Sequence, residues 1–327
     1  MVRFGYTLMT EQSGPRALVR HAPLAERAGF DFQVISDHFS PWLNTQAHAP
    51  YAWSVLGAIC QATERTELMT YVTAPIMRYH PAVVAQKAAT VALLSGGRFT
   101  LGIGAGENLN EHVVGRGWPG VNTRHAMLGE AIEIITELFD GDYLSYRGEH
   151  FTVDSAKLWD VPDSPVPIAV AISGAQSVEQ FAPVADGMIA VEPDAELCRL
   201  WDSTTSSGNR KIGQLPVAWG LDRDEAVHRA WQQFRWFAGG WKVNAELPAP
   251  PNFHAATRFV REDDVADNIP CGPDVDAVVS SARVFWEAGF TDLAFVQIGG
   301  DDHQDGFFEF AERELLPALR DAAPRSR

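Results

Sequence analysis

The segment SDHFSPW, residues 36–42, places a carboxylate, an imidazole and an indole directly after a short apolar run. The imidazole of His38 has a pKa near neutral in ordinary surroundings, which suits it to remove a proton from a hydroxyl group. The indole of Trp42 presents a π face that can stabilise a nearby cation. A simpler interpretation is that Asp37 caps the following turn and that His38 is a surface residue. The position of this segment in the fold decides between the two.

A second candidate segment is GIGAGENLNE, residues 102–111. Its glycines have GxGxG spacing, which differs from the GxGxxG of the nicotinamide fingerprint, and the segment lies deep in the chain. We therefore assign Gly102 and Gly104 to close packing between a strand and a helix. Glu107 and Asn110 follow on the loop and could face a ligand instead.

Other catalytic patterns are absent from the sequence. The ten histidines show neither HxxxH nor HExxH spacing, so we predict no metal site. A serine nucleophile is not indicated, because GxSxG does not occur and Ser173-Gly174 lacks the pattern of a nucleophile elbow. The aromatic cluster WQQFRWFAGGW, residues 231–241, is partly spaced as a helix, and packing explains it better than a substrate cage does.

The elements that position these residues alternate between apolar β runs and helices. The helix expected at residues 123–140, for example, carries Leu128, Ile132, Ile135 and Leu138 at three- and four-residue spacing. Eight β runs lie near residues 4, 32, 69, 100, 168, 188, 215 and 294, and this alternation predicts a parallel sheet with right-handed crossovers. Eight strands close a TIM (β/α)8 barrel, and a doubly wound open sheet is the alternative.

Two stretches interrupt the alternation. Residues 141–165 alternate in the β manner around Arg147-Gly148, which predicts a hairpin. Residues 238–272 are rich in glycine, proline and asparagine, and we expect them to be irregular. The sequence therefore predicts one TIM-barrel domain over residues 1–327 with two insertions.

In such barrels the active site lies at the carboxyl ends of the strands. Asp37 and His38 would follow the second strand and Glu107 would follow the fourth, so the barrel would bring both segments to one mouth. This placement favours the acid–base interpretation over the surface one. The other strand ends are expected to carry Thr10-Glu11, Tyr71-Val72-Thr73 and Ser173-Gly174.

Composition limits the partners. The formal net charge is −16, from 42 acidic and 26 basic residues, and such a surface would repel nucleic acid and anionic membranes. The three cysteines are far apart and lack CxxC spacing, which favours a reducing compartment. No segment has the apolar length of a signal peptide or a membrane span. We therefore expect a cytoplasmic protein that acts on a small molecule.

The segments that carry a family resemblance are TEQ, SDHFSPW, APYAWSVLGA, YVTAPIMRYHPAVVAQ, GIGAGENLNE and SYRGEHF. In these segments the chain resembles the luciferase-like flavin and deazaflavin superfamily. Over about residues 3–320 the chain is most similar to the coenzyme F420-dependent dehydrogenases related to glucose-6-phosphate dehydrogenase. The resemblance implies a TIM barrel, usually a homodimer, that binds the deazaflavin cofactor F420 at its mouth. It also implies hydride transfer between ring carbon five and an organic substrate.

The resemblance also implies roles for individual residues. His38 would take the proton from an alcohol, Glu107 would donate a proton to ring nitrogen one, and Trp42 would steady the charged intermediate. Glu11 would line the substrate pocket, and Asp37 would bind the deazaflavin head. The remaining support for the cofactor would come from a non-prolyl cis peptide between Tyr71 and Val72, and from Asn110 with the Ser173-Gly174 loop.

One loop departs from the sugar-phosphate enzymes, which carry a threonine and a lysine after the sixth strand to hold the phosphate. The matching residues 191–194 are VEPD, whose carboxylates would repel a phosphate. Lys242 or Arg283 could substitute only if the fold brings them to the site. We therefore predict an F420-dependent oxidoreductase for an alcohol or an electrophilic acceptor. The alternatives are an FMN-dependent luciferase-like monooxygenase, an F420-dependent sugar-6-phosphate dehydrogenase and a non-catalytic flavin-binding or carrier protein.

Overall fold

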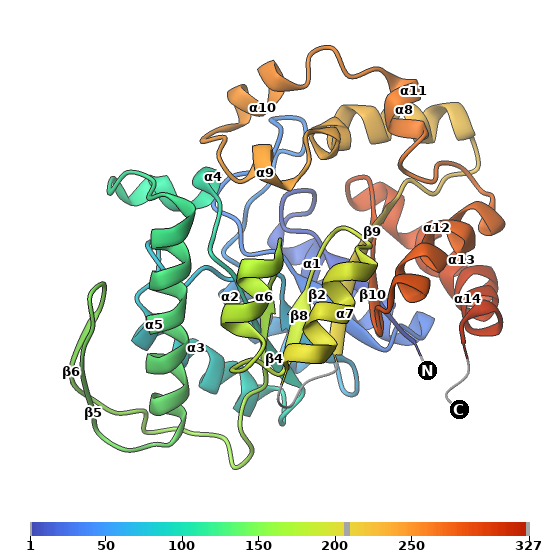
Figure 1. Cartoon of the computed structure of the whole chain (residues 1–327). Coiled ribbons are helices and arrows are strands. Elements are labelled where there is room, and N and C mark those ends of the chain that lie inside the picture. The colour runs from blue at the N-terminus through green and yellow to red at the C-terminus, as the bar shows by residue number, and fades with distance from the viewer. Residues whose placement is uncertain (1, 206–209, 325–327) are drawn as a thin grey trace.

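The computed structural model describes residues 2–205 and 210–324, which form a closed parallel barrel surrounded by helices (Figure 1). The strands neighbour one another in the order β1-β10-β9-β8-β7-β4-β3-β2, and β1 also pairs with β2 to close the barrel. All eight predicted β runs and the TIM barrel are confirmed, and the open sheet is excluded. The barrel strands are β1 (Arg3–Leu8), β2 (Phe32–Ile35), β3 (Glu67–Thr70), β4 (Phe99–Ile103), β7 (Ile168–Ala171), β8 (Gly187–Ile189), β9 (Arg210–Val217) and β10 (Asp292–Gln297).

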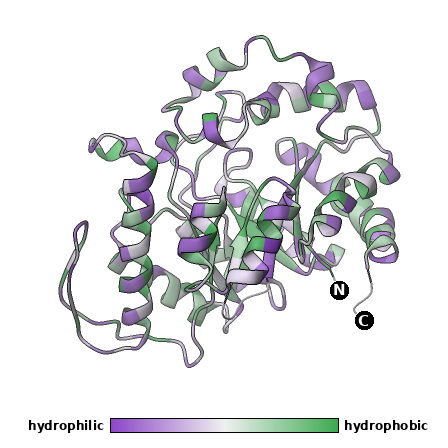
Figure 2. Cartoon of the chain, in the orientation of Figure 1, coloured by the Kyte–Doolittle hydropathy of each residue, from purple (hydrophilic) through white to green (hydrophobic). Residues whose placement is uncertain are grey.

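The helices pack their apolar stripes against the outside of the barrel. In α5 (Val121–Phe139), Leu128, Ile132, Ile135 and Leu138 are all buried, as their spacing predicts. Hydropathy colouring shows apolar strands at the centre and hydrophilic residues on the surrounding helices (Figure 2). The other helices around the barrel are α1 (Pro15–Ala28), α2 (Ala52–Ala62), α3 (Pro81–Leu94), α6 (Ala175–Phe181), α7 (Ala195–Thr204), α8 (Arg223–Phe234), α12 (Val275–Ala288), α13 (Gln304–Phe310) and α14 (Leu316–Ala322).

Side chains fill the barrel interior. One buried cluster comprises Phe32, Val34, Met69, Ala169, Ile189, Ile212 and Ala294. At the amino-terminal end of the barrel, the carboxylates of Glu67 and Asp292 each face the guanidinium groups of Arg3 and Arg210. The barrel is therefore packed and not hollow, and in barrels of this kind the active site lies at the carboxyl ends of the strands.

Two groups of elements lie outside the barrel sheet. Strands β5 (Leu144–Arg147) and β6 (Thr152–Ala156) form the predicted antiparallel hairpin. The prediction of irregular structure for residues 238–272 is wrong. This stretch contains α9 (Trp241–Asn244), α10 (Pro250–Ala256) and α11 (Glu262–Ala266). Helices this short are held by tertiary packing, so the sequence carries little periodic signal for them.

The short helices pack onto the barrel mouth, where Figure 1 shows α9 and α10. Their contacts form a second apolar core that includes Met9, Trp42, Leu43, Leu109, Phe234, Trp236 and Phe253. Several of these residues lie on the loops that follow β1, β2 and β4. The second insertion therefore packs on the same loops that carry the candidate site.

Two further features concern the chain as a whole. No helix among the described residues has both the length and the apolar character needed to cross a membrane. Cys60, Cys198 and Cys271 are free thiols.

Candidate active site

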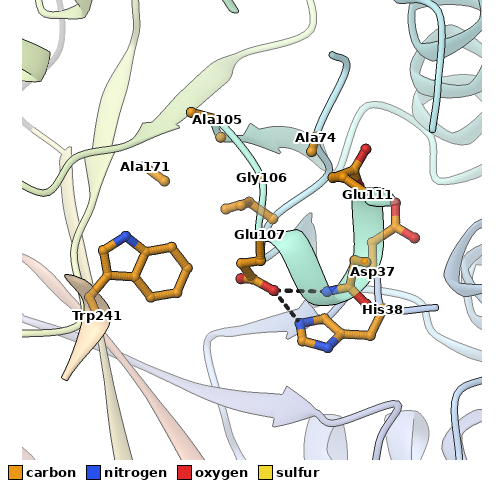
Figure 3. Close-up of a pocket in the computed structure, with 12 residues that line it drawn as sticks. Asp37, His38, Ala74, Ala105, Gly106, Glu107, Glu111, Ala171 and Trp241 are labelled. Carbon is orange, nitrogen blue, oxygen red and sulfur yellow. Dashed lines mark hydrogen bonds and ion pairs between the residues drawn. The ribbon is translucent and has the colours of Figure 1, made fainter. Parts of the chain in front are cut away.

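A small cavity of about 50 Å³ opens at the carboxyl ends of the strands. Small apolar residues line one side of it, namely Val72, Ala74, Gly104, Ala105 and Ala171. The polar lining residues are Asp37, His38, Glu107, Asn110 and Glu111. Trp241 of α9 also lines the cavity, and Figure 3 shows its ring to one side of the Glu107 carboxyl. Five predicted site residues, Asp37, His38, Val72, Glu107 and Asn110, thus meet at one cavity.

The imidazole of His38 lies between two carboxylates. Its Nδ1 is 3.2 Å from Glu11 Oε1, and its Nε2 is 3.4 Å from Glu107 Oε2. Nδ1 is also 3.2 Å from the backbone carbonyl oxygen of Ser40. Nδ1 has two acceptors at 3.2 Å, whereas Nε2 has one at the longer distance of 3.4 Å, so we assign the proton of the neutral ring to Nδ1. The lone pair on Nε2, on the side of Glu107, is then available to accept a proton.

Glu11 lies behind the imidazole and is not among the residues that line the cavity. Its Oε2 accepts hydrogen bonds from the Ser36 hydroxyl at 2.5 Å and the Thr10 hydroxyl at 3.1 Å. The side chain is almost fully buried. These two hydroxyl donors hold the carboxylate, which in turn orients the imidazole.

Glu107 and Asn110 are presented by one helical turn, α4 (Asn108–Glu111), which Glu107 directly precedes. Asn110 Nδ2 donates to Glu107 Oε2 at 2.8 Å. Burial raises the pKa of Glu107, although His38 partly opposes this shift. The carboxyl therefore keeps its proton to a higher pH than an exposed glutamate would.

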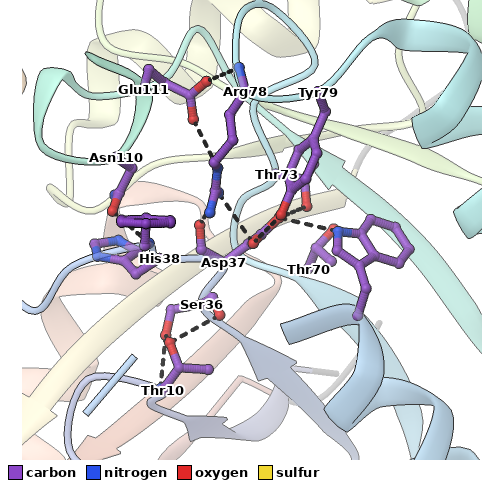
Figure 4. Close-up of polar contacts among 12 residues, drawn as sticks. Thr10, Ser36, Asp37, His38, Thr70, Thr73, Arg78, Tyr79, Asn110 and Glu111 are labelled. Carbon is purple, nitrogen blue, oxygen red and sulfur yellow. Dashed lines mark hydrogen bonds and ion pairs between the residues drawn. The ribbon is translucent and has the colours of Figure 1, made fainter. Parts of the chain in front are cut away.

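The carboxylate of Asp37 accepts four hydrogen bonds within the protein (Figure 4). Thr73 Oγ1 and Trp53 Nε1 donate to Oδ2 at 2.8 and 3.1 Å. Tyr79 Oη and Arg78 Nη2 donate to Oδ1, each at 3.1 Å. A carboxylate offers about four acceptor positions, so little capacity remains for a ligand. Sequence reasoning missed these four donors, because nothing in the spacing of Trp53, Tyr79 or Arg78 connects them with Asp37.

The peptide bond between Tyr71 and Val72, directly after β3, is cis, as predicted. Val72 lines the cavity, whereas Tyr71 packs on the apolar cluster inside the barrel. The Tyr71 hydroxyl is buried without a hydrogen-bond partner among the described residues. Tyr71 and Val72 are both predicted to contact the cofactor, but of the two only Val72 lines the cavity.

Gly102 and Gly104 pack against neighbouring strands, so the predicted packing against a helix is wrong. A Cβ atom on Gly102 would lie 1.9 Å from the carbonyl oxygen of Thr70 in β3. On Gly104 it would lie 2.9 Å from Val72 Cγ2 and 3.1 Å from Ala171 Cβ. Gly102 therefore permits the close approach of two strands, and Gly104 leaves room at the wall of the cavity.

Aromatic side chains stand beside the imidazole. The ring of Trp42 is 4.9 Å from that of His38 and stacks on Trp236 at 4.2 Å, with an interplanar angle of 10°. Phe253 meets Trp42 edge-on at 5.2 Å. The packing role predicted for the aromatic cluster is confirmed for Trp236 and for Trp241, which packs against the second apolar core. Trp241 also lines the cavity. The residues around Trp241, directly after Gly239-Gly240, show no helical period, so the spacing could not indicate this position.

The remaining predicted residues lie outside the cavity lining. Ser173 and Gly174 follow β7, and their backbone N–H groups bond to Ser177 Oγ at 3.2 and 3.3 Å. Asp194 caps α7 by accepting from two backbone N–H groups. Lys242 and Arg283 are both exposed, on α9 and α12. Among the residues that the structure describes, no group of three metal-ligating side chains occurs.

The shape and polarity of the cavity suit a planar ring with polar edges. A Cβ atom on Gly104 would crowd Val72 and Ala171, so glycine and the small apolar residues beside it leave room at this wall of the cavity. The Glu107 carboxyl and the Asn110 amide lie at its border and can meet ring heteroatoms. The closed barrel and this arrangement at its mouth are those of a TIM-barrel enzyme.

Comparison with known proteins names the family. The family model described as luciferase-like monooxygenase matches residues 1–292, and the chain belongs to this family. It is 33% identical over 335 residues to the F420-dependent glucose-6-phosphate dehydrogenase of Segniliparus rotundus, covering 98% of both chains. It is also 33% identical over 324 residues to the F420-dependent hydroxymycolic acid dehydrogenase of Mycobacterium tuberculosis, covering 97% of this chain and 88% of the relative. A solved F420-dependent secondary alcohol dehydrogenase in complex with an F420-acetone adduct matches with a TM-score of 0.87 at 27% identity, covering 98% of this chain and 99% of that chain.

Proposed function

We propose that this protein is an F420-dependent oxidoreductase that transfers hydride between the coenzyme and an uncharged alcohol or electrophilic acceptor. The observation that carries the proposal is His38, held between Glu11 and Glu107 at the edge of a cavity with one wall of small apolar residues. Similarity over nearly the whole chain to relatives named as F420-dependent supports the choice of coenzyme.

His38 is the proposed base. With Nδ1–H directed to Glu11 and to the Ser40 carbonyl oxygen, Nε2 can accept the hydroxyl proton of an alcohol. The charge of Glu11, 3.2 Å away, would stabilise the imidazolium ion that forms. In the reverse direction Nε2 returns the proton.

Glu107 is the proposed proton donor to the cofactor side of the cavity. The Asn110 amide and the imidazole of His38 both lie against Oε2, which leaves Oε1 to carry the proton. Burial raises the pKa of this carboxyl, so more of it is protonated near neutral pH than for an exposed glutamate.

Coenzyme F420, when bound, supplies a ring carbon that accepts or releases hydride. Val72 and Gly104 would support the ring through the apolar wall, and Asn110 would bind its polar edge. Asp37 would act mainly by fixing the loop, because its carboxylate is already occupied. The backbone at Ser173 and Gly174, further out along the end of β7, is assigned to the cofactor's side chain.

The substrate is proposed to be uncharged. Trp42, packed on the buried Trp236 and Phe253, gives the imidazole an apolar neighbour. Trp241 adds an apolar side chain to the cavity, which suits a hydrocarbon group. The loop after β8 offers exposed carboxylates of Glu192 and Asp194 and no cation. A phosphate there would meet repulsion instead of a charge-assisted hydrogen bond, normally worth about 1.5–3 kcal/mol.

Competitive titration with F420 and FMN tests the coenzyme. We expect F420 to bind much more tightly than FMN, as measured by F420 fluorescence or absorbance. We also expect bound F420 to be reduced by an alcohol. Stoichiometric FMN that F420 cannot displace would favour the luciferase-like monooxygenase instead. Tight F420 binding with no turnover against alcohols, carbonyls and sugar phosphates would favour a carrier protein.

We further infer that residues 1–327 form one barrel domain that works as a homodimer in the cytoplasm. Helix α3 exposes Val83, Leu93 and Leu94, apolar surface that a second copy would bury. The free cysteines fit a reducing compartment. Light scattering should give about twice the chain mass of 35.9 kDa, and the monomer mass at micromolar concentration would contradict the homodimer.

A further inference from the structure

Arg78 and Glu111 form a buried ion pair next to the peptide that precedes His38 (Figure 4). Glu111 Oε2 accepts the backbone N–H of Arg78 at 2.8 Å, and Glu111 Oε1 is 3.5 Å from Arg78 Nε. Arg78 Nη2 donates to the backbone carbonyl oxygen of Asp37 at 2.6 Å and to its carboxylate at 3.1 Å. The two side chains of the pair are 9% and 1% exposed. The carbonyl directly before His38 is thus held by Arg78, and Glu111 holds Arg78 by accepting a hydrogen bond from its backbone N–H and by an ion-pair contact with its guanidinium.

The backbone after His38 is held from the same helical turn. Asn110 Oδ1 accepts the backbone N–H of Phe39 at 2.8 Å and that of Ser40 at 3.3 Å. Asn110 and Glu111 are consecutive residues of α4. This turn therefore fixes the chain on both sides of the imidazole, directly through Asn110 and indirectly through Arg78.

We propose that Arg78 and Glu111 are positioning residues for His38, which set the direction of its imidazole by clamping the Asp37–His38 peptide. The inference rests on the proposed function, because it presupposes that His38 moves the substrate proton. The planar guanidinium suits the task, since it directs Nη2 to Asp37 and Nε to Glu111 at the same time. A lysine ammonium is a single point charge and cannot reproduce this fork.

A purely stabilising role is the competing explanation. Buried ion pairs often add little net stability, because desolvation of the two charges offsets their attraction. The pair also lies against the segment that carries the cis peptide and the cavity wall, so its removal could simply loosen the fold. The test must therefore separate loss of rate from loss of folding.

The first arm of the test compares Arg78→Lys and Glu111→Gln with Arg229→Lys as a matched control. Arg229 is also buried and donates to two backbone carbonyl oxygens and to Glu225, but it lies outside the candidate site. We expect the single-turnover rate of hydride transfer to fall by about 10- to 100-fold in the two site variants, because small displacements of reacting groups carry penalties of this order. The dissociation constant for F420 should change much less, and Arg229→Lys should lower only the melting temperature.

The second arm adds each substitution to His38→Ala. If Arg78 and Glu111 act through the imidazole, they should cause no further loss once it is gone. Equal losses in the presence and absence of His38, or a similar rate loss in Arg229→Lys, would overturn the proposal.

A third measurement does not depend on turnover. The ¹⁵N NMR signals of the His38 ring, assigned by their loss in His38→Ala, should shift in Arg78→Lys and Glu111→Gln but not in Arg229→Lys. Unchanged signals would contradict positioning even in an active enzyme. If the two variants show the expected shifts but the wild-type protein reduces no F420, the proposed function is refuted and the clamp on His38 stands.

Discussion

At the scale of single residues, the orientation of His38 follows from what surrounds each ring nitrogen. Nδ1 faces only acceptors, the Glu11 carboxylate and the Ser40 carbonyl oxygen, whereas Nε2 faces the buried carboxyl of Glu107. This asymmetry places a basic nitrogen beside a carboxyl group whose pKa is raised by burial. An enzyme that moves one proton off its substrate and delivers another needs both.

Removal of either group should reduce turnover without removing the coenzyme. We expect His38→Ala and Glu107→Gln each to lower kcat by about 100- to 10,000-fold, the usual contribution of an acid–base group. F420 affinity should stay within a few-fold of wild type, because the cavity wall is unchanged. Stopped-flow absorbance of F420 and a binding titration measure the two quantities, and wild-type rates in both variants would remove these residues from the mechanism.

Glu111 should make stability depend on pH. Burial raises its pKa from 4.5 to about 7, although Arg78 opposes the shift, while Asp37 and Glu107 add to it. Between these two pH values the folded state binds more protons than the unfolded state, so stability falls as pH rises through this window. One such group contributes at most about 1.4 kcal/mol per pH unit.

Urea unfolding at several pH values between 4.5 and 8 measures this effect. The decline should be shallower in Glu111→Gln than in wild type, and the exposed Glu196→Gln should behave as wild type. Parallel curves for wild type and Glu111→Gln would show that Glu111 does not titrate in this range.

At the scale of elements, the site depends on how closely β4 approaches its neighbours. The glycine at position 104 leaves room between Val72 and Ala171, and the turn that follows β4 carries Glu107 and Asn110. One strand and its loop thus supply both an apolar wall and a polar edge.

Gly104→Ala should weaken F420 binding. Its Cβ would lie 2.9 Å from Val72 Cγ2, and overpacking of this kind costs about 1–3 kcal/mol. If the cost falls on the complex, affinity drops roughly 5- to 150-fold. Gly57→Ala in α2 is the control, since its Cβ would meet no described atom within 4 Å. Isothermal titration should separate the two variants, and equal F420 affinities would mean that the ring does not lie on this wall.

At the scale of the whole molecule, the amino-terminal end of the barrel is closed by charge. Asp292, 3% exposed at its side chain, faces both Arg3 and Arg210 across neighbouring strands. Asp292→Asn should destabilise the protein by about 1.5–3 kcal/mol, the usual contribution of hydrogen bonds to charged groups, because the two arginines would keep only Glu67 as a carboxylate partner among the described residues. Its kcat should be unchanged. Glu196→Gln, which breaks only an exposed pair, should cost less than about 1 kcal/mol. Denaturant unfolding compares them, and equal free energies would show that this cluster does not hold the barrel closed.

The sequence predicted the barrel well because each β run is apolar and each long helix has a regular stripe, as in α5. The strand ends then located Asp37, His38 and Glu107. The donors to Asp37 could not be predicted, since Trp53 and Arg78 reach it only through the folded arrangement of α2 and the loop after β3. Trp241 was missed for a related reason: four-residue helices have no period to read.

The most direct test of the central claim is the absorbance of F420 after anaerobic mixing of enzyme and coenzyme with a substrate. We expect uncharged secondary alcohols to bleach oxidised F420, or matching carbonyl compounds to restore reduced F420, with saturation kinetics that disappear in His38→Ala. Glucose-6-phosphate should act poorly, because the loop after β8 carries Glu192 and Asp194 and no lysine or arginine that could hold a phosphate. Efficient turnover of glucose-6-phosphate at micromolar concentration would contradict the proposed substrate class. Failure of every alcohol and carbonyl compound to change F420 absorbance would contradict the proposed reaction.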